Sequence, residues 1–306
     1  MRQQLCEALA VRSANTDMVF LTGDLGFMAL EPLQKTMQSR FINAGIAEQN
    51  MVSVAAAMAR EGLEAWVYSI APFCYARPFE QIRNDVSFHN LPVKLIGNGG
   101  GYGYGVMGPT HHAIEDYGVL LTLPNMRVYI PAFEEDIREV IECAGNISSP
   151  VYIRIGRGEI PVGCIAPKYA PWRQITDGDG MVVIVAGPLV GAYLETVQAL
   201  PKSIRPKLWV VSELPLDLNP LPFELIEQLT QERGLCIVEE HVRQGGLASQ
   251  IALILQERNL KAGTFHHLYA RAHHFPTYGS QNFLRVQSNL DIDSLMAVAV
   301  PNFPFV

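Results

Sequence analysis

The sequence has few of the features that mark membrane, secreted or nucleic-acid-binding proteins. Its longest apolar run, residues 181–194, is broken by Gly187, Pro188 and Gly191, so no segment reaches the length of a transmembrane helix. The first residues lack the apolar stretch of a signal peptide, and the five cysteines are scattered without a CxxC spacing. The net charge of −7 disfavours nucleic acid and anionic membranes as partners. We therefore expect a cytoplasmic protein with reduced thiols.

The chain does contain a regular alternation of strand-like and helix-like segments. Its 306 residues are enough for two α/β domains, and a composition of 49% apolar and 17% charged residues is typical of a globular protein. Strands are predicted first at 18–22, 40–43, 65–69, 93–97, 127–130 and 151–155, and later at 181–186, 207–212, 235–239 and 264–268. This spacing predicts two doubly wound, mostly parallel sheets, in domains 1–165 and 180–306, joined by a proline-containing linker at 166–179.

Glu48 stands at a position that suits chemistry. Residues 40–43 read as a short strand that ends near Gly45, and an apolar helix begins near Ala47. Glu48 then lies in the first helical turn, where free backbone N–H groups and the helix dipole stabilise a carboxylate. By itself, the same pattern also fits an acid that only complements the dipole at a solvated helix start.

Other polar features follow predicted strand ends of the first domain. They are Asp24, a glycine-rich loop at 97–105 and His111, and the carboxyl edge of an open parallel sheet is where ligands bind. His111 and His112 follow a Gly-Pro-Thr tripeptide, where a histidine can move a proton near neutral pH or only cap a helix. Residues 103–108 match GxGxxG, but no strand directly precedes them. We therefore expect these glycines to let the backbone approach a flat ligand or a partner chain.

Three segments resemble the transketolase family, and their order and spacing are also similar to those of deoxyxylulose phosphate synthase. They are residues 40–50 (RFINAGIAEQN), 108–111 (GPTH) and 123–126 (LPNM). The resemblance runs from about residue 1 to 298 and covers the family's pyrimidine-binding and C-terminal domains, without the domain that holds the cofactor's diphosphate. It implies the small subunit of a split thiamine diphosphate-dependent transketolase that transfers a two-carbon unit to an aldehyde.

The resemblance places several residues around the cofactor. Glu48 matches the glutamate that hydrogen-bonds the aminopyrimidine ring and so promotes loss of the proton from the thiazolium carbon. Asp24 and Leu25 match the segment that reaches the cofactor near the thiazolium. The family's aromatic walls for the pyrimidine fall at three aromatic residues: Tyr68, Phe73 and Tyr75. Ordinary core packing is the alternative for each, and Phe73 is the preferred wall.

The resemblance also implies substrate contacts. His111 matches the histidine that hydrogen-bonds substrate hydroxyls, and His112 lies beside it. Either Arg154 or Arg157 lies where the family has a phosphate-binding arginine, although each also fits a surface charge at a strand end. Met107 stands where the family usually has an aspartate that binds a donor hydroxyl. Because a thioether cannot replace that acid, the usual ketose phosphates are left open as donors.

The sequence does not predict a metal site in this chain. Two histidine pairs, His266-His267 and His273-His274, have diverging side chains and no cysteine or carboxylate cluster to complete a coordination shell. Thiamine enzymes hold diphosphate and magnesium with a GDG motif and a later asparagine. Here Gly178-Asp179-Gly180 has no asparagine in 204–214, so we expect an ordinary turn.

The implied cofactors are thiamine diphosphate and Mg²⁺, the latter held mainly by a large partner subunit that carries the diphosphate-binding domain. We expect an α2β2 heterotetramer with a homodimeric core that acts on a sugar phosphate or a 2-oxo acid. One alternative is the β subunit of a 2-oxo acid decarboxylase with acyl transfer, or an enzyme like deoxyxylulose phosphate synthase. Another is a non-catalytic α/β scaffold subunit, against which Glu48 and His111 argue together.

Overall fold

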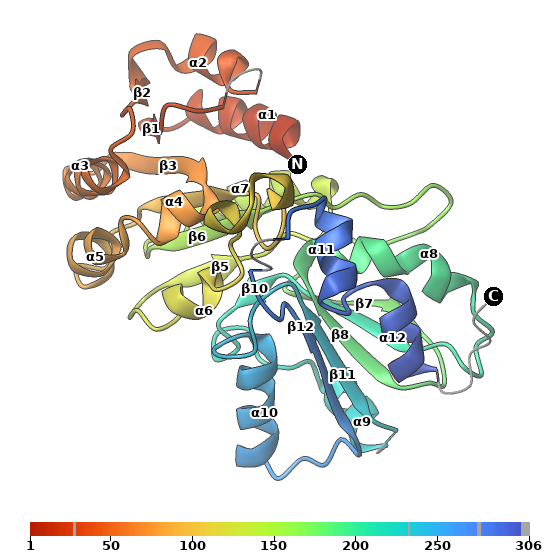
Figure 1. Cartoon of the computed structure of the whole chain (residues 1–306). Helices are drawn as coiled ribbons and strands as arrows, with labels where there is room; N and C mark the ends of the chain where they lie inside the picture. Colours follow the sequence, from red (N-terminus) through yellow and green to blue (C-terminus); the bar gives the residue numbers. More distant parts are fainter. Residues whose placement is uncertain (27–28, 232, 274–276, 301–306) are drawn as a thin grey trace.

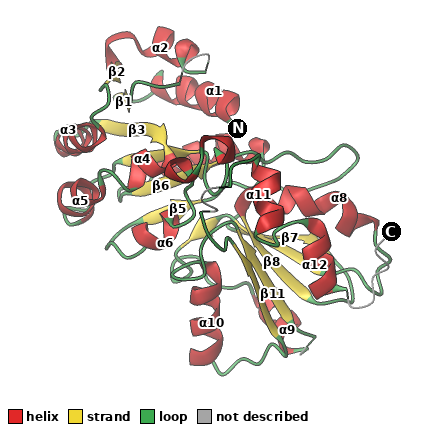
Figure 2. Cartoon of the chain, viewed as in Figure 1, coloured by secondary structure: helices red, strands yellow, loops and turns green. Residues whose placement is uncertain are grey.

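The computed structural model describes residues 1–26, 29–231, 233–273 and 277–300. These residues form two α/β units, one at the upper left of Figure 1 and one at the lower right. Figure 2 shows that the strands of each unit gather in one sheet with helices packed against it. No helix in the described ranges has the length and apolar character needed to cross a bilayer.

The first unit is built on a seven-stranded sheet with the order β10-β5-β6-β4-β3-β1-β2. Its strands are β1 (Met18–Thr22), β2 (Phe41–Asn43), β3 (Glu64–Ile70), β4 (Lys94–Asn98), β5 (Arg127–Tyr129), β6 (Val151–Ile155) and β10 (Glu213–Leu214). All neighbours pair in parallel except β10, which pairs antiparallel with β5. The mostly parallel sheet predicted for this part of the chain is confirmed.

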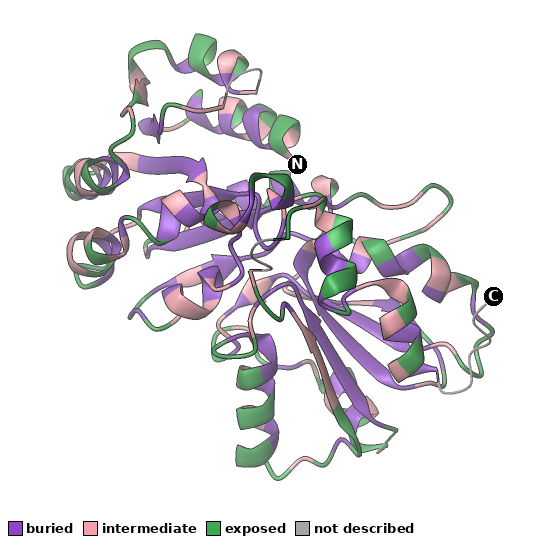
Figure 3. Ribbon diagram, in the orientation of Figure 1, coloured by how far each residue is buried: buried purple, intermediate pink, exposed green. Residues whose placement is uncertain are grey.

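The connections of the first unit are helical. Its helices are α1 (Arg2–Ser13), α2 (Glu31–Met37), α3 (Glu48–Arg60), α4 (Ala71–Tyr75), α5 (Phe79–Gln81), α6 (Asp116–Leu120) and α7 (Ile137–Gly145), with short 3-10 or π turns at η1 (Gln38–Arg40), η2 (Ile82–Ser87), η3 (Gly105–Met107), η4 (Pro109–His111) and η5 (Glu134–Asp136). Helices α1, α2 and α7 cover one face of the sheet, and α3, α4 and α6 cover the other. Figure 3 shows buried strands between helices whose outer faces are exposed.

The strands of this sheet supply both cores by alternation. In β3, Ala65 and Val67 pack with α3 and α4, whereas Trp66 and Tyr68 pack with α1 and α7. Successive side chains point to opposite faces of a strand, so a fully apolar strand serves two cores at once. Tyr68 therefore lies on the face opposite to α3, the helix that begins with Glu48.

The second unit has a five-stranded sheet with the order β12-β11-β8-β9-β7. Its strands are β7 (Trp172–Thr176), β8 (Val182–Ala186), β9 (Lys207–Val211), β11 (Leu235–Glu239) and β12 (Phe265–Tyr269). Its helices are α8 (Gly191–Ala199), α9 (Phe223–Thr230), α10 (Leu247–Glu257), α11 (Gln281–Gln287) and α12 (Ile292–Ala299), with a 3-10 turn at η6 (Gly187–Val190). Only β7 runs antiparallel to its neighbour, so this unit is also the expected α/β domain.

The boundary between the units differs from the predicted linker. Strand β7 lies inside the expected linker 166–179, where it pairs with β9 and completes the second sheet. Strand β10 comes from the second half of the chain but extends the first sheet by pairing with β5. The two units are thus joined by shared strand pairing as well as by the chain between them.

Buried polar contacts also join the two units. Arg173 in β7 contacts Asp136 in η5 at 2.7 Å, and both side chains are buried. Arg285 in α11 contacts Glu240 at 2.7 Å, and Glu240 in turn accepts a hydrogen bond from the backbone N–H of Tyr102 at 2.6 Å. Because each charge has a close partner, the interface can be polar and still exclude water.

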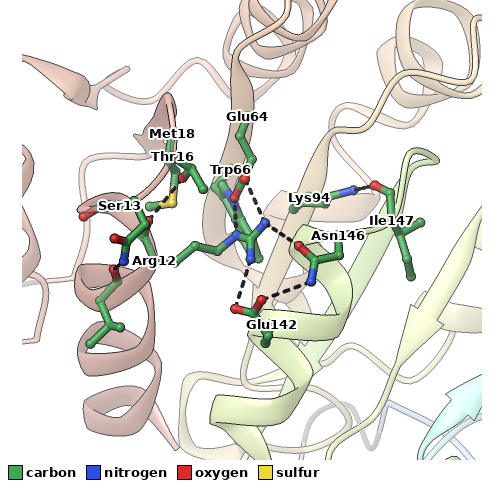
Figure 4. A network of polar contacts seen from close by, with 12 residues as sticks. Arg12, Ser13, Thr16, Met18, Glu64, Trp66, Lys94, Glu142, Asn146 and Ile147 are labelled. Carbon is green, nitrogen blue, oxygen red and sulfur yellow. Dashed lines mark hydrogen bonds and ion pairs between the residues drawn. The ribbon is translucent and has the colours of Figure 1, made fainter.

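A second polar network, centred on the buried Arg12 and shown in Figure 4, ties α1 to α7 and β3 at the edge where the strands begin. The Arg12 guanidinium donates to both carboxylate oxygens of Glu64, at 2.6 and 2.9 Å, and to Glu142 at 3.1 Å. It also donates to the Asn146 side chain at 3.1 Å. This network lies at the edge opposite to the strand ends that carry the predicted site.

Candidate active site

The strands that lead to several of the predicted site residues are neighbours in the first sheet. Strands β4, β3, β1 and β2 lie side by side and parallel, so their carboxyl ends share one edge of the sheet. Asp24 follows β1, Glu48 follows β2, Phe73 follows β3, and the glycine-rich loop with His111 follows β4. This is the edge at which open α/β sheets bind ligands.

Glu48 is the first residue of α3, and its side chain is only 5% exposed. The chain reaches it from β2 through Gly45, whose φ of +69° is a left-handed conformation that favours glycine. The carboxylate accepts a hydrogen bond from Arg77 Nη1 at 2.9 Å. Glu48 is therefore a buried, paired acid and not the solvated acid of the alternative interpretation.

Arg77 links Glu48 to two further side chains. Its guanidinium carbon lies 4.0 Å from the centre of the Phe73 ring. The Phe73 ring meets the His111 ring edge-on, with centroids 5.1 Å apart and planes at 71°. We call Glu48, Arg77, Phe73 and His111 the Glu48 cluster. It combines a carboxylate, an aromatic face and an imidazole, which are groups that can hold a flat, nitrogen-containing ring.

His111 is held where it can act as a neutral imidazole. Its Nδ1 lies 3.0 Å from Thr110 Oγ1, and the Tyr104 ring is 6.4 Å away. Burial and the nearby positive charge of Arg77 both lower the pKa of His111 below its ordinary value of 6.5. A neutral ring offers one donor and one acceptor nitrogen, so His111 can hydrogen-bond hydroxyl groups in either direction.

The glycine-rich loop packs closely against the second unit. The backbone N–H groups of Gly99 and Gly100 donate to the carbonyl of Ile155. A Cβ at Gly101, which has a φ of +63°, would lie 2.6 Å from the Glu240 carboxyl carbon. The close approach expected of these glycines is thus made here to Glu240 of the same chain. Asn98 steadies the loop through a 2.6 Å hydrogen bond to the Tyr104 hydroxyl.

Asp24 and Leu25 border a cavity of about 500 Å³ at the ends of β1 and β2. Asp24 is exposed and accepts a hydrogen bond from the Asn43 side chain at 3.0 Å, while its backbone N–H donates to Gly45. These contacts fix the turn after β1 relative to the segment that leads into α3. Glu31 and Gln34 of α2 also line the cavity, and no member of the Glu48 cluster borders it.

Two of the three predicted aromatic walls are buried in the protein interior. Tyr68 packs against Phe20 in the core under α1, so the structure does not place it beside Phe73. Tyr75 is buried and donates to Glu115 at 3.1 Å. Burial, with the nearby carboxylates, raises the pKa of Tyr75 well above its ordinary value. Phe73, the preferred wall, is the partly exposed member of the three.

His112 faces away from the Glu48 cluster. It is buried, its ring stacks on that of His273 at 5.8 Å, and it meets the Tyr102 ring edge-on at 5.2 Å. His273 belongs to the second unit and contacts Glu115, which raises the pKa of this histidine. The geometry therefore gives His112 a place between the two units, in contrast to the predicted substrate contact.

The two arginines predicted as phosphate ligands lie in different environments. Arg154 is 4% exposed, pairs with Asp116 at 2.9 Å, and donates to the carbonyl groups of Ala113 and Glu240. A guanidinium so enclosed cannot reach a substrate phosphate, which corrects the prediction for Arg154. Arg157 is exposed just beyond β6, and Met107 in η3 is 55% exposed.

Sequence reasoning missed Arg77, Asn98 and Tyr104. Arg77 follows Phe73 by four residues, a spacing that places two side chains on one side of a helical turn, and this was the available signal. The part of the chain that the structure describes holds no group of three or more potential metal ligands. His274 lies outside the described residues.

The sequence is similar to a known family and to two curated proteins. Residues 5–162 match the family described as "Transketolase, pyrimidine binding domain". The chain is 31% identical to one subunit of the apulose-4-phosphate transketolase of Phocaeicola vulgatus, over 81% of each chain. It is 29% identical to the subunit of the same name from Actinobacillus succinogenes, over 89% of this chain and 87% of the relative.

A solved structure supports the likeness over nearly the whole chain. It is titled a split gene transketolase, inactive beta4 tetramer, and is 26% identical with a TM-score of 0.79, covering 97% of this chain and 95% of the other. Its full-length match includes the second unit as well as the first. The chain belongs to the transketolase family, and residues 5–162 form its pyrimidine-binding domain.

Proposed function

We propose that this chain is the small subunit of a split thiamine diphosphate-dependent transketolase. It would transfer a two-carbon unit from a ketose or 2-oxo donor to an aldehyde acceptor, together with a larger partner subunit. The observation that carries the proposal is the buried Glu48 carboxylate, which lies beside Phe73 and His111 at the ligand edge of a pyrimidine-binding domain. The names of the two relatives make apulose 4-phosphate the first donor to test.

The Glu48 cluster fits the aminopyrimidine end of thiamine diphosphate. Glu48 would hydrogen-bond a ring nitrogen and share its proton, and the low exposure of the carboxylate would keep water from competing. Phe73 would offer its ring face to the flat pyrimidine. When bound, thiamine diphosphate supplies a nucleophilic thiazolium carbon and an electron sink for the donor's carbanion.

The substrate side would be formed by His111, Arg157 and Met107. His111, whose pKa is lowered by burial and by the charge of Arg77, would orient substrate hydroxyls by donating and accepting hydrogen bonds. Arg157 is the exposed arginine at the sheet edge and would meet a phosphate group. Met107 would border the donor and reduce selection for a hydroxyl at that point.

The remaining parts of the enzyme would come from the partner. We assign the diphosphate and Mg²⁺ to a larger chain with the GDG motif, and Asp24 and Leu25 of this chain to the thiazolium side of the cofactor. The assembly would be an α2β2 heterotetramer in the cytoplasm, with contacts between two copies of this chain at its core.

The proposal is tested by mixing this chain with its candidate partner, thiamine diphosphate and Mg²⁺. The donors offered are apulose 4-phosphate, a linear ketose phosphate and pyruvate, each with an aldehyde acceptor, and the products are followed by mass spectrometry. We expect two-carbon transfer from a ketose phosphate. Turnover of pyruvate instead would establish the 2-oxo acid alternative, and no turnover with any donor would support a non-catalytic subunit.

Glu48→Gln is the matched variant for this assay because it keeps shape and burial while removing the charge and the shared proton. We expect turnover to fall by more than about 100-fold, in the range that general acid–base groups contribute. Assembly with the partner, measured by analytical ultracentrifugation, should be unchanged. Full activity in Glu48→Gln would show that the Glu48 carboxylate takes no part in the reaction.

A further inference from the structure

Arg77 makes two contacts that a bound pyrimidine would also need. Its Nη1 donates to Glu48 at 2.9 Å, and its guanidinium lies over the Phe73 ring at 4.0 Å. Glu48 and Phe73 are the two groups assigned above to the aminopyrimidine, the first to its nitrogen and the second to its face. Arg77 therefore covers both of these groups in the chain as it stands.

The chemistry of a guanidinium makes it a close substitute for an aminopyrimidine. It is a planar group of carbon and nitrogen that donates hydrogen bonds in its plane and stacks its face on aromatic rings. A protonated aminopyrimidine has the same two properties. A buried carboxylate is strongly destabilised without a partner, so Glu48, at 5% exposure, has to be paired by some donor when no ligand is bound.

Arg77 also has a route away from the site. Its side chain is 45% exposed, in contrast to Glu48, and it lies in the short connection between α4 and α5. If the guanidinium turned outward, it would be solvated by water at little cost, because this is the usual state of an arginine head group. The Glu48 carboxylate and the Phe73 ring, fixed by α3 and α4, would stay in place.

We propose that Arg77 is a placeholder that occupies the aminopyrimidine position and must leave it when thiamine diphosphate binds. This inference rests on the proposed function and adds a competition step to cofactor binding. The apparent dissociation constant of the cofactor then equals the intrinsic constant divided by the fraction of molecules in which Arg77 has moved out. Arg77 would keep the free subunit stable and would limit its affinity for the cofactor.

The proposal is tested by whether removal of the Arg77 side chain strengthens or weakens cofactor binding. The complex of this chain with its partner is titrated with thiamine diphosphate and Mg²⁺ by calorimetry, for wild type, Arg77→Ala and Arg77→Met. We expect both variants to bind the cofactor about tenfold more tightly, because a partly exposed ion pair and a cation–π contact no longer compete. Unchanged or weaker binding of the cofactor by both variants would contradict the proposal that Arg77 is a placeholder. Weaker binding would show instead that Arg77 supports Glu48 in the cofactor-bound state as well.

The matched control is Arg83→Ala. Arg83 is exposed and lies 4.8 Å over the Phe88 ring, so it makes the same kind of cation–π contact away from Glu48. Its loss should leave the cofactor affinity unchanged. A gain equal to that of Arg77→Ala would show a general effect of charge and would count against the placeholder.

Two further measurements separate this inference from the proposed function and from misfolding. Without cofactor, Arg77→Ala should lower the thermal midpoint of the chain because Glu48 loses its partner, and circular dichroism should stay that of a folded protein. Glu48→Gln should weaken cofactor binding if the proposed function holds. Failure of wild type to bind the cofactor would contradict the proposed function, whereas binding by wild type with no gain in Arg77→Ala would contradict the placeholder alone.

Discussion

At the scale of single residues, the charge on Arg77 acts on both ends of the Glu48 cluster. It pairs with Glu48, and it also disfavours the charged form of His111 through space. Partial burial, and then this charge, lower the pKa of His111 below its ordinary value. A single arginine thereby influences the protonation of the histidine proposed to meet the substrate.

Removal of this arginine should therefore raise the pKa of His111. In Arg77→Ala the positive charge is gone but the burial remains, so we expect the pKa to rise while staying at or below the ordinary 6.5. NMR titration of the chain with ¹⁵N-labelled histidine measures it, and Arg83→Ala should leave it unchanged. A lower pKa in Arg77→Ala would show that Arg77 does not act on His111 by its charge.

Met107→Asp tests the donor side of the site. Met107 is 55% exposed in η3, so an aspartate fits without disturbing the core. We expect kcat/KM to improve by about tenfold for hydroxylated donors relative to pyruvate, since a single added hydrogen bond to a charged group contributes about 1.5–3 kcal/mol at most. If the ratio of kcat/KM for the hydroxylated donor to kcat/KM for pyruvate is the same in wild type and variant, position 107 does not contribute to donor selection.

Sequence reasoning reached part of the residue-scale picture. Glu48, Phe73 and His111 follow from strand ends and family motifs, and the structure brings them together. Tyr68 could have been excluded, because its period-2 alternation with Val67 puts it on the opposite face of β3. Arg154 and Arg157 cannot be told apart in the sequence. Only the fold shows that Arg154 is paired with Asp116 in the protein interior.

At the scale of elements, a buried lysine ties β4 to the loop that follows α7. Lys94 begins β4, is fully buried, and donates to the carbonyl groups of Ile147 and Ser149, the latter at 3.1 Å. Figure 4 shows it beside the Arg12 network. Burial lowers the pKa of Lys94 to about 7, because the charged form is poorly solvated there.

This burial predicts that stability rises with pH. Between pH 7 and about 10.5 the unfolded chain holds a proton on Lys94 that the folded chain has released, so higher pH favours folding by up to about 1.4 kcal/mol per pH unit. We expect Lys94→Met to lose this contribution in urea unfolding at pH 7, 8 and 9. The exposed Lys261→Met is the control, and equal slopes in Lys94→Met and wild type would contradict the assignment.

The elements themselves were predicted best where local pattern and burial agree. Strands β1 and β6 have the predicted bounds because their residues are mostly apolar and every one of them is buried. Strand β7 was missed because its alternating sequence lies among prolines and is held by pairing with β9, a contact that local pattern does not encode. Helices α4 and α11, of five and seven residues, are too short to give a clear helical period in the sequence.

At the scale of the whole molecule, Arg154 is part of the joint between the units. It pairs with Asp116 of the first unit and donates to the backbone of Glu240 in the second. Asp116 also accepts a hydrogen bond from Tyr152 at 2.9 Å. These contacts lie directly beneath the glycine-rich loop, so they hold the segment that leads to His111.

Arg154→Met should destabilise the whole chain by about 3–5 kcal/mol, since it leaves the Asp116 charge buried without its cation. The free energy of unfolding from urea titration measures this. The double variant Arg154→Met with Asp116→Leu should recover part of the loss, as it removes both charges. If Arg154→Met leaves the unfolding midpoint unchanged but raises KM for phosphorylated substrates, the structural role is contradicted. Arg154 would then be a substrate-binding residue, as the sequence predicted.

Strand β10 has a consequence for dividing this polypeptide. It satisfies the backbone N–H and C=O groups along one border of β5, and one continuous apolar cluster extends from β1 and β3 to β8, β9 and β11. A fragment cut after residue 165 would leave that border open to pairing with other molecules and would tend to aggregate. A break that leaves this border of β5 covered therefore has to fall outside the stretch that runs from β5 to β10.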